Sequence, residues 1–222
     1  MSLCRSGCHL FSHLFSHSLS HSLSHSEGPF GGYYGYDPPP SLPRPICVIG
    51  LMGSEAQTVT YSAASLTGYP LIDLDAQVEH SAGRSLSALY ALEGPGGWRA
   101  RELDALRRAL RASPTPLIAL GDGALLSGEA RALRRAGASL VYIRRPLSEC
   151  LTGLARAHER APLRFPLWPH KPPSSADELA PLLAARSPAY EEAELVLEGE
   201  GRGALELAME LVAWLAEVAA TS

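Results

Sequence analysis

Lysine is almost missing from this chain of 222 residues. Lys171 is the one lysine among 19 lysine and arginine residues, so arginine supplies nearly all of the positive charge. Acidic residues number 23 and the formal net charge is −4, which leaves no polycationic surface for nucleic acid. No apolar run approaches the roughly 18 residues that a membrane span requires. Nucleic acid and membrane are therefore not expected as partners.

Cysteine is also scarce. Cys47 lies in an apolar run and Cys150 in a segment of helical pattern, whereas Cys4 and Cys8 lie near the start of the chain. Free cysteines are commonly buried as small apolar residues, and disulfides are rare in reducing compartments. We expect Cys47 and Cys150 to be reduced core residues and the protein to be cytoplasmic.

Residues 1–45 have the composition of a tail. The stretch FSHLFSHSLSHSLSHS repeats every four residues and is followed by a Gly/Tyr/Pro-rich linker. On a helix its histidines would share one face and could hold a metal ion; a low-complexity, disordered tail is the interpretation we favour. The serine-rich composition also resembles a transit peptide, although Arg5 is the one arginine before Glu27. The folded domain is expected over 46–219.

From Ile46 onward, apolar runs alternate with amphipathic segments. The runs are ICVIG, PLIDLD, PLIALG, SLVYIR and AELVLE, and helical patterns cover residues 99–111, 128–135 and 203–218. Short apolar strands separated by helices predict a parallel sheet covered on both faces. The expected fold class is α/β, a three-layer α/β/α domain with a central parallel sheet.

Ligands of such sheets bind beyond the carboxyl ends of the strands. The residues that follow the first three expected strands are Gly50–Gln57, Asp73–Asp75 and Gly121–Gly123. The first of these is a glycine-bearing loop between a strand and an expected helix, which is where a phosphate-binding loop lies.

Five segments match the motifs of a known enzyme family. GLMG resembles the start of its phosphate loop, and LTGYPLIDLD its second strand with an Asp-x-Asp motif. VEHSAGRSLSALYALEGPGGWRARE resembles its run from a Gly-Arg-Ser helix start to a Phe-Arg-x-x-Glu motif. IALGDGALL resembles a Gly-Gly-Gly strand end, and RSPAYEEAELVL an Arg-x-Pro-Leu-Tyr segment. Together they resemble the shikimate kinase family, which implies a P-loop kinase-like fold and a place in the chorismate pathway.

The resemblance implies a substrate half. Arg99 and Arg186 would bind the carboxylate of shikimate, which suits the planar guanidinium fork. Asp75 would accept hydrogen bonds from the substrate hydroxyls and help deprotonate the attacking one, as the catalytic residue. Gly121 and Gly123 would border the substrate. In isolation, the favoured interpretation would be arginines on helix surfaces and an aspartate that caps a helix; in the matched segments we favour the site.

Two further aspartates bear on a metal ion. By resemblance, Asp73 would lie near magnesium and contact it through water, although it too could cap the following helix. Asp122 replaces the middle glycine of the family's triple. Its carboxylate would either repel the substrate or join Asp73 around a cation.

A working phosphate loop reads G-x-x-x-x-G-K-[ST], because its glycines, lysine and hydroxyl bind the phosphates and magnesium. Gly50 fills the first glycine position, Gly53 a middle position, and Thr58 follows the motif. Arg160 best matches the arginine of the family's lid, in RAPL with Ala161 inserted. The lid segment that follows is rich in proline.

The remaining positions of the loop are changed. Glu55, Ala56 and Gln57 stand where the second glycine, the lysine and the magnesium-binding hydroxyl belong. If the backbone of Glu55 is left-handed, strain of about 1–3 kcal/mol follows. Rescue by Lys171 would be unusual.

These substitutions predict a shikimate kinase-like pseudoenzyme in which ATP-dependent phosphorylation of the shikimate 3-hydroxyl is impaired or lost. The alternative is an active shikimate kinase with an atypical loop. Mg²⁺ and ATP are expected as cofactors only if the protein is active. Shikimate or a similar small molecule is the expected ligand, and a monomer the expected state.

Overall fold

The computed structural model describes residues 41–121, 124–125, 129–160 and 171–221. The chain divides into two units, Met1–Asp37 and Pro38–Ser222, and the described residues belong to the second. The predicted histidine repeat and the start of the linker lie outside the described residues. None of the described helices combines the length and apolarity that crossing a bilayer needs.

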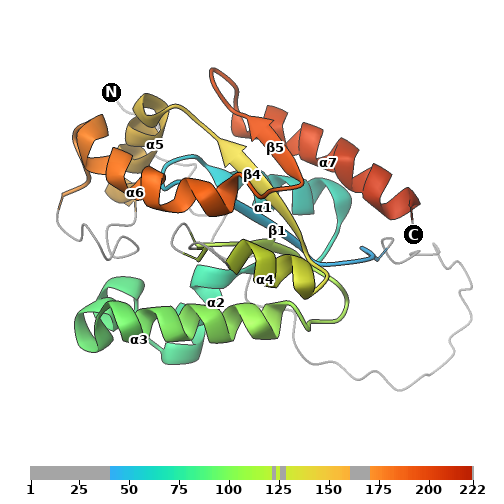
Figure 1. The fold of residues 1–222 in the computed structure, drawn as a ribbon, viewed down its shortest axis with the longest axis horizontal. Coiled ribbons are helices and arrows are strands. Elements are labelled where there is room, and N and C mark those ends of the chain that lie inside the picture. Colours follow the sequence, from blue (N-terminus) through green and yellow to red (C-terminus); the bar gives the residue numbers. More distant parts are fainter. Residues whose placement is uncertain (1–40, 122–123, 126–128, 161–170, 222) are drawn as a thin grey trace, which may run out of the picture. The chain divides into compact units, whose positions relative to one another are not determined.

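A five-stranded sheet forms the centre of the described unit, and all of its strands are parallel (Figure 1). The order across the sheet is β2-β3-β1-β4-β5. Each strand coincides with one of the five apolar runs, which confirms the predicted parallel sheet. The strands are β1 (Ile46–Gly50), β2 (Leu71–Asp73), β3 (Leu117–Ala119), β4 (Ser139–Arg144) and β5 (Leu195–Glu198).

The described residues form seven helices. They are α1 (Ala56–Thr67), α2 (Leu74–Ala82), α3 (Leu86–Ala109), α4 (Glu129–Arg135), α5 (Leu147–Arg160), α6 (Ala176–Tyr190) and α7 (Ala204–Ala220). Of these, α1–α6 lie between strands and α7 follows β5. Helix α3 starts earlier than the segment predicted from residue 99, and it is interrupted at Gly94, where φ is 67° and ψ is −176°. The proline-rich lid segment is helical from Ala176 onward.

Helices cover both faces of the sheet, as alternation along β1 illustrates. Ile46 and Val48 belong to a core cluster with residues of α1 and α7. Cys47 and Ile49 belong to a second cluster with residues of α2, α3, α4 and α6 on the opposite face. Both faces of the strand are therefore buried, which is why its sequence is a continuous apolar run. The predicted three-layer α/β/α architecture is confirmed.

Cys47 and Cys150 are buried free thiols, as predicted. Burial raises the pKa of Cys47 to about 12. Burial also raises the pKa of Cys150 to about 11. Neither thiol is ionised near neutral pH, so both behave as small apolar groups of the core.

The end of the expected linker is part of the folded unit. Leu42 is 2% exposed and packs in the cluster beneath α1 and α7. Arg44 donates from Nε to Oγ of Ser139 at 2.5 Å and pairs with Glu194 at 3.2 Å. Composition assigned residues 41–45 to the linker, but an apolar side chain and two polar contacts attach them to the sheet.

Candidate functional site

The loop between β1 and α1 packs too closely against its surroundings for side chains at two positions. A β-carbon at Gly50 would overlap Oγ of Ser54 and lie 3.0 Å from the carbonyl oxygen of Ile143. Gly53 has a φ of 81°, and a β-carbon there would lie 2.7 Å from the backbone nitrogen of Leu154 on α5. Backbone contacts and a positive φ therefore require glycine at position 53, whereas at Gly50 the nearest obstacle is the Ser54 hydroxyl. The nucleotide-binding role of both glycines stays a prediction.

Glu55 has a left-handed backbone, with φ of 64° and ψ of 18°. It is the one non-glycine residue with positive φ in the described backbone. Glycine adopts this conformation without a steric penalty, whereas another residue is strained by about 1–3 kcal/mol. The left-handed conformation considered from the sequence is present. Glu55 precedes α1, yet its side chain makes no capping hydrogen bond to that helix.

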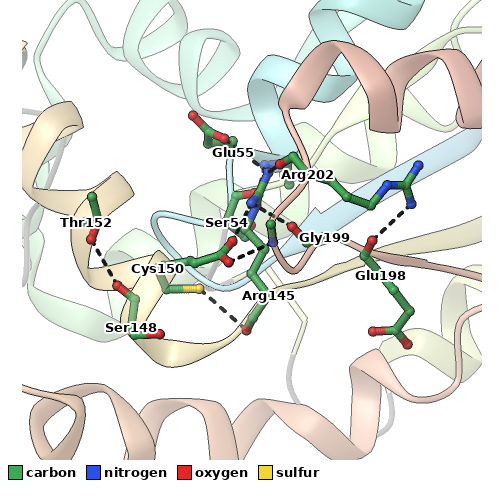
Figure 2. A network of polar contacts seen from close by, with 12 residues as sticks. Ser54, Glu55, Arg145, Ser148, Cys150, Thr152, Glu198, Gly199 and Arg202 are labelled. Atoms are coloured by element: carbon green, nitrogen blue, oxygen red, sulfur yellow. Dashed lines mark hydrogen bonds and ion pairs between the residues drawn. The ribbon is translucent and has the colours of Figure 1, made fainter.

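Arg145 follows β4 and ties this loop to the neighbouring strand ends (Figure 2). Its guanidinium donates from Nε to the carbonyl oxygen of Ser54 at 2.9 Å and pairs with the carboxylate of Glu55 at 3.2 Å. It also pairs with Glu149 at 2.7 Å. A backbone N–H from Gly201 and the Arg145 guanidinium lower the pKa of Glu149. Arg145 therefore links the loop to Glu149 on α5.

Asp73 is bound by side chains from α1 and by its own helix. Nε2 of Gln57 donates to Oδ2 of Asp73 at 2.6 Å, and the hydroxyl of Tyr61 donates to the same oxygen at 2.9 Å. Oδ1 accepts the backbone N–H of Ala76 at 3.1 Å, which caps α2. The capping interpretation is therefore confirmed, and the proposed place near magnesium stays a prediction.

A cavity of about 440 Å³ opens beside the loop. Its lining comes from the loop, α5 and the turn between β5 and α7, and comprises Gly53, Glu55, Arg145, Glu149, Thr152, Gly153, Arg156, Gly201, Arg202, Gly203 and Ala204. Two carboxylates and three guanidinium groups therefore border one cavity.

The loop departs from the motif in the groups that would bind an ATP–magnesium complex. The loop has no lysine, and the one lysine of the chain is Lys171. Gln57 presents an amide where the motif has a hydroxyl. Among the described residues, no group of three or more His, Cys, Asp or Glu side chains is arranged to hold a metal ion.

The predicted substrate residues Asp75 and Gly121 lie close to Glu102. Glu102 belongs to the Trp-Arg-x-x-Glu segment but was not predicted as a site residue. A β-carbon at Gly121 would lie 2.6 Å from Oδ1 of Asp75 and 3.2 Å from Oε1 of Glu102. Glu102 is 3% exposed and accepts from Nη1 of Arg99 at 3.1 Å. Nη2 of Arg99 donates to the carbonyl oxygen of Ala124 at 2.7 Å. Asp75, Arg99 and Glu102 therefore converge around Gly121.

Other predicted residues are placed without a test of their role. Arg186 is on α6 and 7% exposed, so it is a buried arginine and not the helix-surface residue of the alternative interpretation. Thr58 is exposed on α1, and Arg160 is exposed at the end of α5. The carboxylate-binding role of Arg186 and the nucleotide-binding roles of Thr58 and Arg160 stay predictions. Gly123, Asp122 and Ala161 lie outside the described residues.

The sequence analysis did not identify three residues of this region. Arg145 and Tyr61 act through contacts with residues far along the chain, and no local motif marks them. Glu102 carried a signal, because it ends the Trp-Arg-x-x-Glu segment three residues after Arg99. On a helix, residues three apart share a face, so an ion pair between these two side chains was predictable.

A strand, a glycine-bearing loop and a helix at the centre of a parallel sheet define the class of P-loop kinase-like folds. The shikimate kinase family model matches residues 52–216. The chain therefore belongs to the shikimate kinase family.

Individual relatives agree with this assignment. The shikimate kinase of Nitrosomonas europaea is 36% identical over 109 residues, which is 49% of this chain and about half, 51%, of that relative. The shikimate kinase of Pseudomonas savastanoi pv. phaseolicola is 31% identical over 176 residues, 79% of this chain and 98% of that relative. The structure of Acinetobacter baumannii shikimate kinase in complex with shikimate has a TM-score of 0.64 at 24% identity, and covers 78% of this chain and 93% of that chain.

Proposed function

We propose that this member of the shikimate kinase family binds shikimate or a similar hydroxylated acid and has lost most of its ATP-dependent phosphoryl transfer. The observation that carries the proposal is the 2.6 Å hydrogen bond from Gln57 to Asp73. It places a neutral amide on the carboxylate that would lie near magnesium, from the position where the motif has a metal-binding hydroxyl.

The size of the loss follows from the loop. Removing one preorganised donor from an active site typically costs about 10²–10³ in rate. A carboxylate about 4 Å from a phosphate charge is repelled by about 4 kcal/mol at an effective dielectric constant near 20. The missing lysine and the added Glu55 act in the same direction, because both weaken binding of the outer phosphates.

The substrate half supports retained ligand binding. Arg99 is oriented by Glu102 and a backbone carbonyl, and the carboxylates of Asp75 and Glu102 both lie beside Gly121. Preorientation lowers the entropy that a guanidinium loses when it binds a carboxylate. The same convergence favours the second candidate, an active shikimate kinase that uses ATP and Mg²⁺. A monomeric state and a cytoplasmic location remain predictions.

One pair of measurements tests the proposal. Calorimetric titration with shikimate should show binding by the wild type, and Arg99→Ala should weaken it by about 1.5–3 kcal/mol, the range for hydrogen bonds to charged groups. Arg107→Ala is the matched control, since Arg107 is exposed on the same helix. No shikimate binding by the wild type would reject the ligand assignment.

The second measurement is coupled ADP release with and without shikimate. The wild type should show little shikimate-dependent turnover. The triple variant Glu55→Gly, Ala56→Lys, Gln57→Ser should gain some turnover if the substrate half is intact. Substantial turnover by the wild type would overturn the pseudoenzyme assignment in favour of the active kinase.

A further inference from the structure

The guanidinium of Arg145 has every donor engaged. Nε donates to Ser54, Nη1 donates to Glu149, and Nη2 donates to Glu55. Nη1 and Nη2 also each donate, at 2.8 Å, to a carbonyl oxygen of the turn between β5 and α7. An arginine side chain carries five N–H donors. With a side chain 6% exposed, Arg145 is saturated by groups of the described chain.

Glu55 is the most exchangeable of these five acceptors. Three of the acceptors are backbone carbonyls, which are fixed by the fold. The Glu149 carboxylate is held from two sides, because its Oε1 also accepts the backbone N–H of Gly201 at 2.8 Å. The Glu55 side chain is 40% exposed, and within the described part of the chain its one contact is Arg145 at 3.2 Å. Its carboxylate can leave without breaking the backbone arrangement.

The surroundings of Glu55 favour an anion. The cavity beside it is also lined by Arg156, which is exposed on α5 and has no partner among the described residues. Helices α1 and α7 both begin at this cavity without a side-chain cap. Helix N-termini favour negative charge, and in this structure the carboxylate of Glu55 supplies it next to Arg145.

We propose that Glu55 is a tethered anion, an autoinhibitory contact that fills the phosphate position beside Arg145. The inference rests on the proposed function and deepens it, because it names the group that takes the place of the nucleotide's phosphate. Inorganic phosphates and polyphosphates are the ligand class that this carboxylate excludes. Removing its charge uncovers one donor of Arg145 and the cavity in front of it.

The test is calorimetric titration with inorganic tripolyphosphate, in the absence of divalent metal and at one fixed salt concentration. Glu55→Gln keeps the size of the side chain and removes its charge. Glu55→Gly fits the left-handed backbone, so it folds without strain. Asp104→Asn is the matched control, because it makes the same change in net charge at an exposed ion pair with Arg108 on α3.

Both Glu55 variants should bind tripolyphosphate at least tenfold more tightly than the wild type and Asp104→Asn. Equal affinity of all four proteins would overturn the inference, and so would micromolar binding by the wild type. Titration of the same proteins with shikimate tests the proposed function separately, because Arg99 and Arg186 lie on α3 and α6. Tripolyphosphate binding gained without any shikimate binding would reject the proposed ligand and leave the tethered anion standing.

Discussion

Replacing Gly153 with alanine should destabilise the protein, although Gly153 lies inside a helix. A β-carbon at this position of α5 would overlap the carbonyl oxygen of Gly53 and lie 3.1 Å from its carbonyl carbon. The obstacle is the backbone of the loop, which cannot rotate away as a side chain can. The loop or the helix must therefore shift. Gly96 in α3 is the matched control, because a β-carbon there meets nothing within 4 Å.

Two opposing effects decide the sign. Alanine in place of a helical glycine gains about 1 kcal/mol of helix propensity. Overpacking of a well-packed site costs about 1–3 kcal/mol, and contact with backbone puts Gly153→Ala at the upper end. We expect Gly153→Ala to lose about 1–2 kcal/mol of unfolding free energy, which lowers Tm by roughly 5 °C for a domain of this size. Gly96→Ala should gain about 1 kcal/mol.

Urea denaturation followed by circular dichroism measures both variants against the wild type. The m-value should stay constant, since neither change alters the surface exposed on unfolding. If Gly153→Ala were as stable as Gly96→Ala, the loop would not be packed against α5 as described. That result would refute the close contact between Gly53 and Gly153 and the description of the cavity beside the loop.

Deleting residues 1–40 should leave Tm unchanged, whereas deleting residues 1–45 should lower Tm and reduce the unfolding free energy by about 2 kcal/mol, since fully burying a leucine is worth about that much; equal melting of the two truncations would contradict the packing of Leu42 in the core. Iodoacetamide at pH 8 followed by peptide mapping should leave Cys47 and Cys150 unmodified in the native protein, because burial raises both pKa values; labelling of either without denaturant would refute this. Millimolar Mg-ATP should raise Tm little or not at all, since stabilisation grows as RT ln(1 + [L]/Kd); micromolar affinity by calorimetry would be incompatible with the damaged loop. The pKa of Glu149 is lowered from 4.5, so its contribution to stability is complete above that pH and is lost as the pH falls through the lower folded-state pKa. Glu149→Gln should therefore flatten the acid limb of a stability–pH profile. An unchanged limb would argue against the contacts of Glu149 with Arg145.

The sheet was predictable because its strands are buried on both faces. A run such as Ile46–Gly50 is apolar throughout, so the signal needs no knowledge of its neighbours. The start of α3 was harder to place, because Gly94 and Pro95 interrupt the helical pattern before Arg99. Local glycine and proline signals normally mark the end of a helix, and here the same helix continues after the break.

The site was predictable only where it follows a motif. Asp75 and Gly121 were assigned to the substrate because their segments resemble motifs of the family, and both follow strands whose carboxyl ends meet at one edge of the sheet. The contact between Glu55 and Arg145 joins residues 90 positions apart in the sequence. Periodic patterns indicate only local structure, so they could not predict it. The cap that Asp73 forms with Ala76 was one of its two predicted roles, whereas its contacts with Gln57 and Tyr61 are visible only in the folded arrangement.

The two contacts made by Glu55 and Gln57 determine what a substitution at either position would do to the loop. The residues lie two positions apart, yet one binds Arg145 after β4 and the other binds Asp73 at the end of β2. A reversion at Gln57 alone removes the contact with Asp73, while Glu55 still occupies its place beside Arg145. Neighbouring substitutions of this kind are not additive. Gln57→Ser on its own is therefore expected to lose an internal contact without gaining phosphate binding.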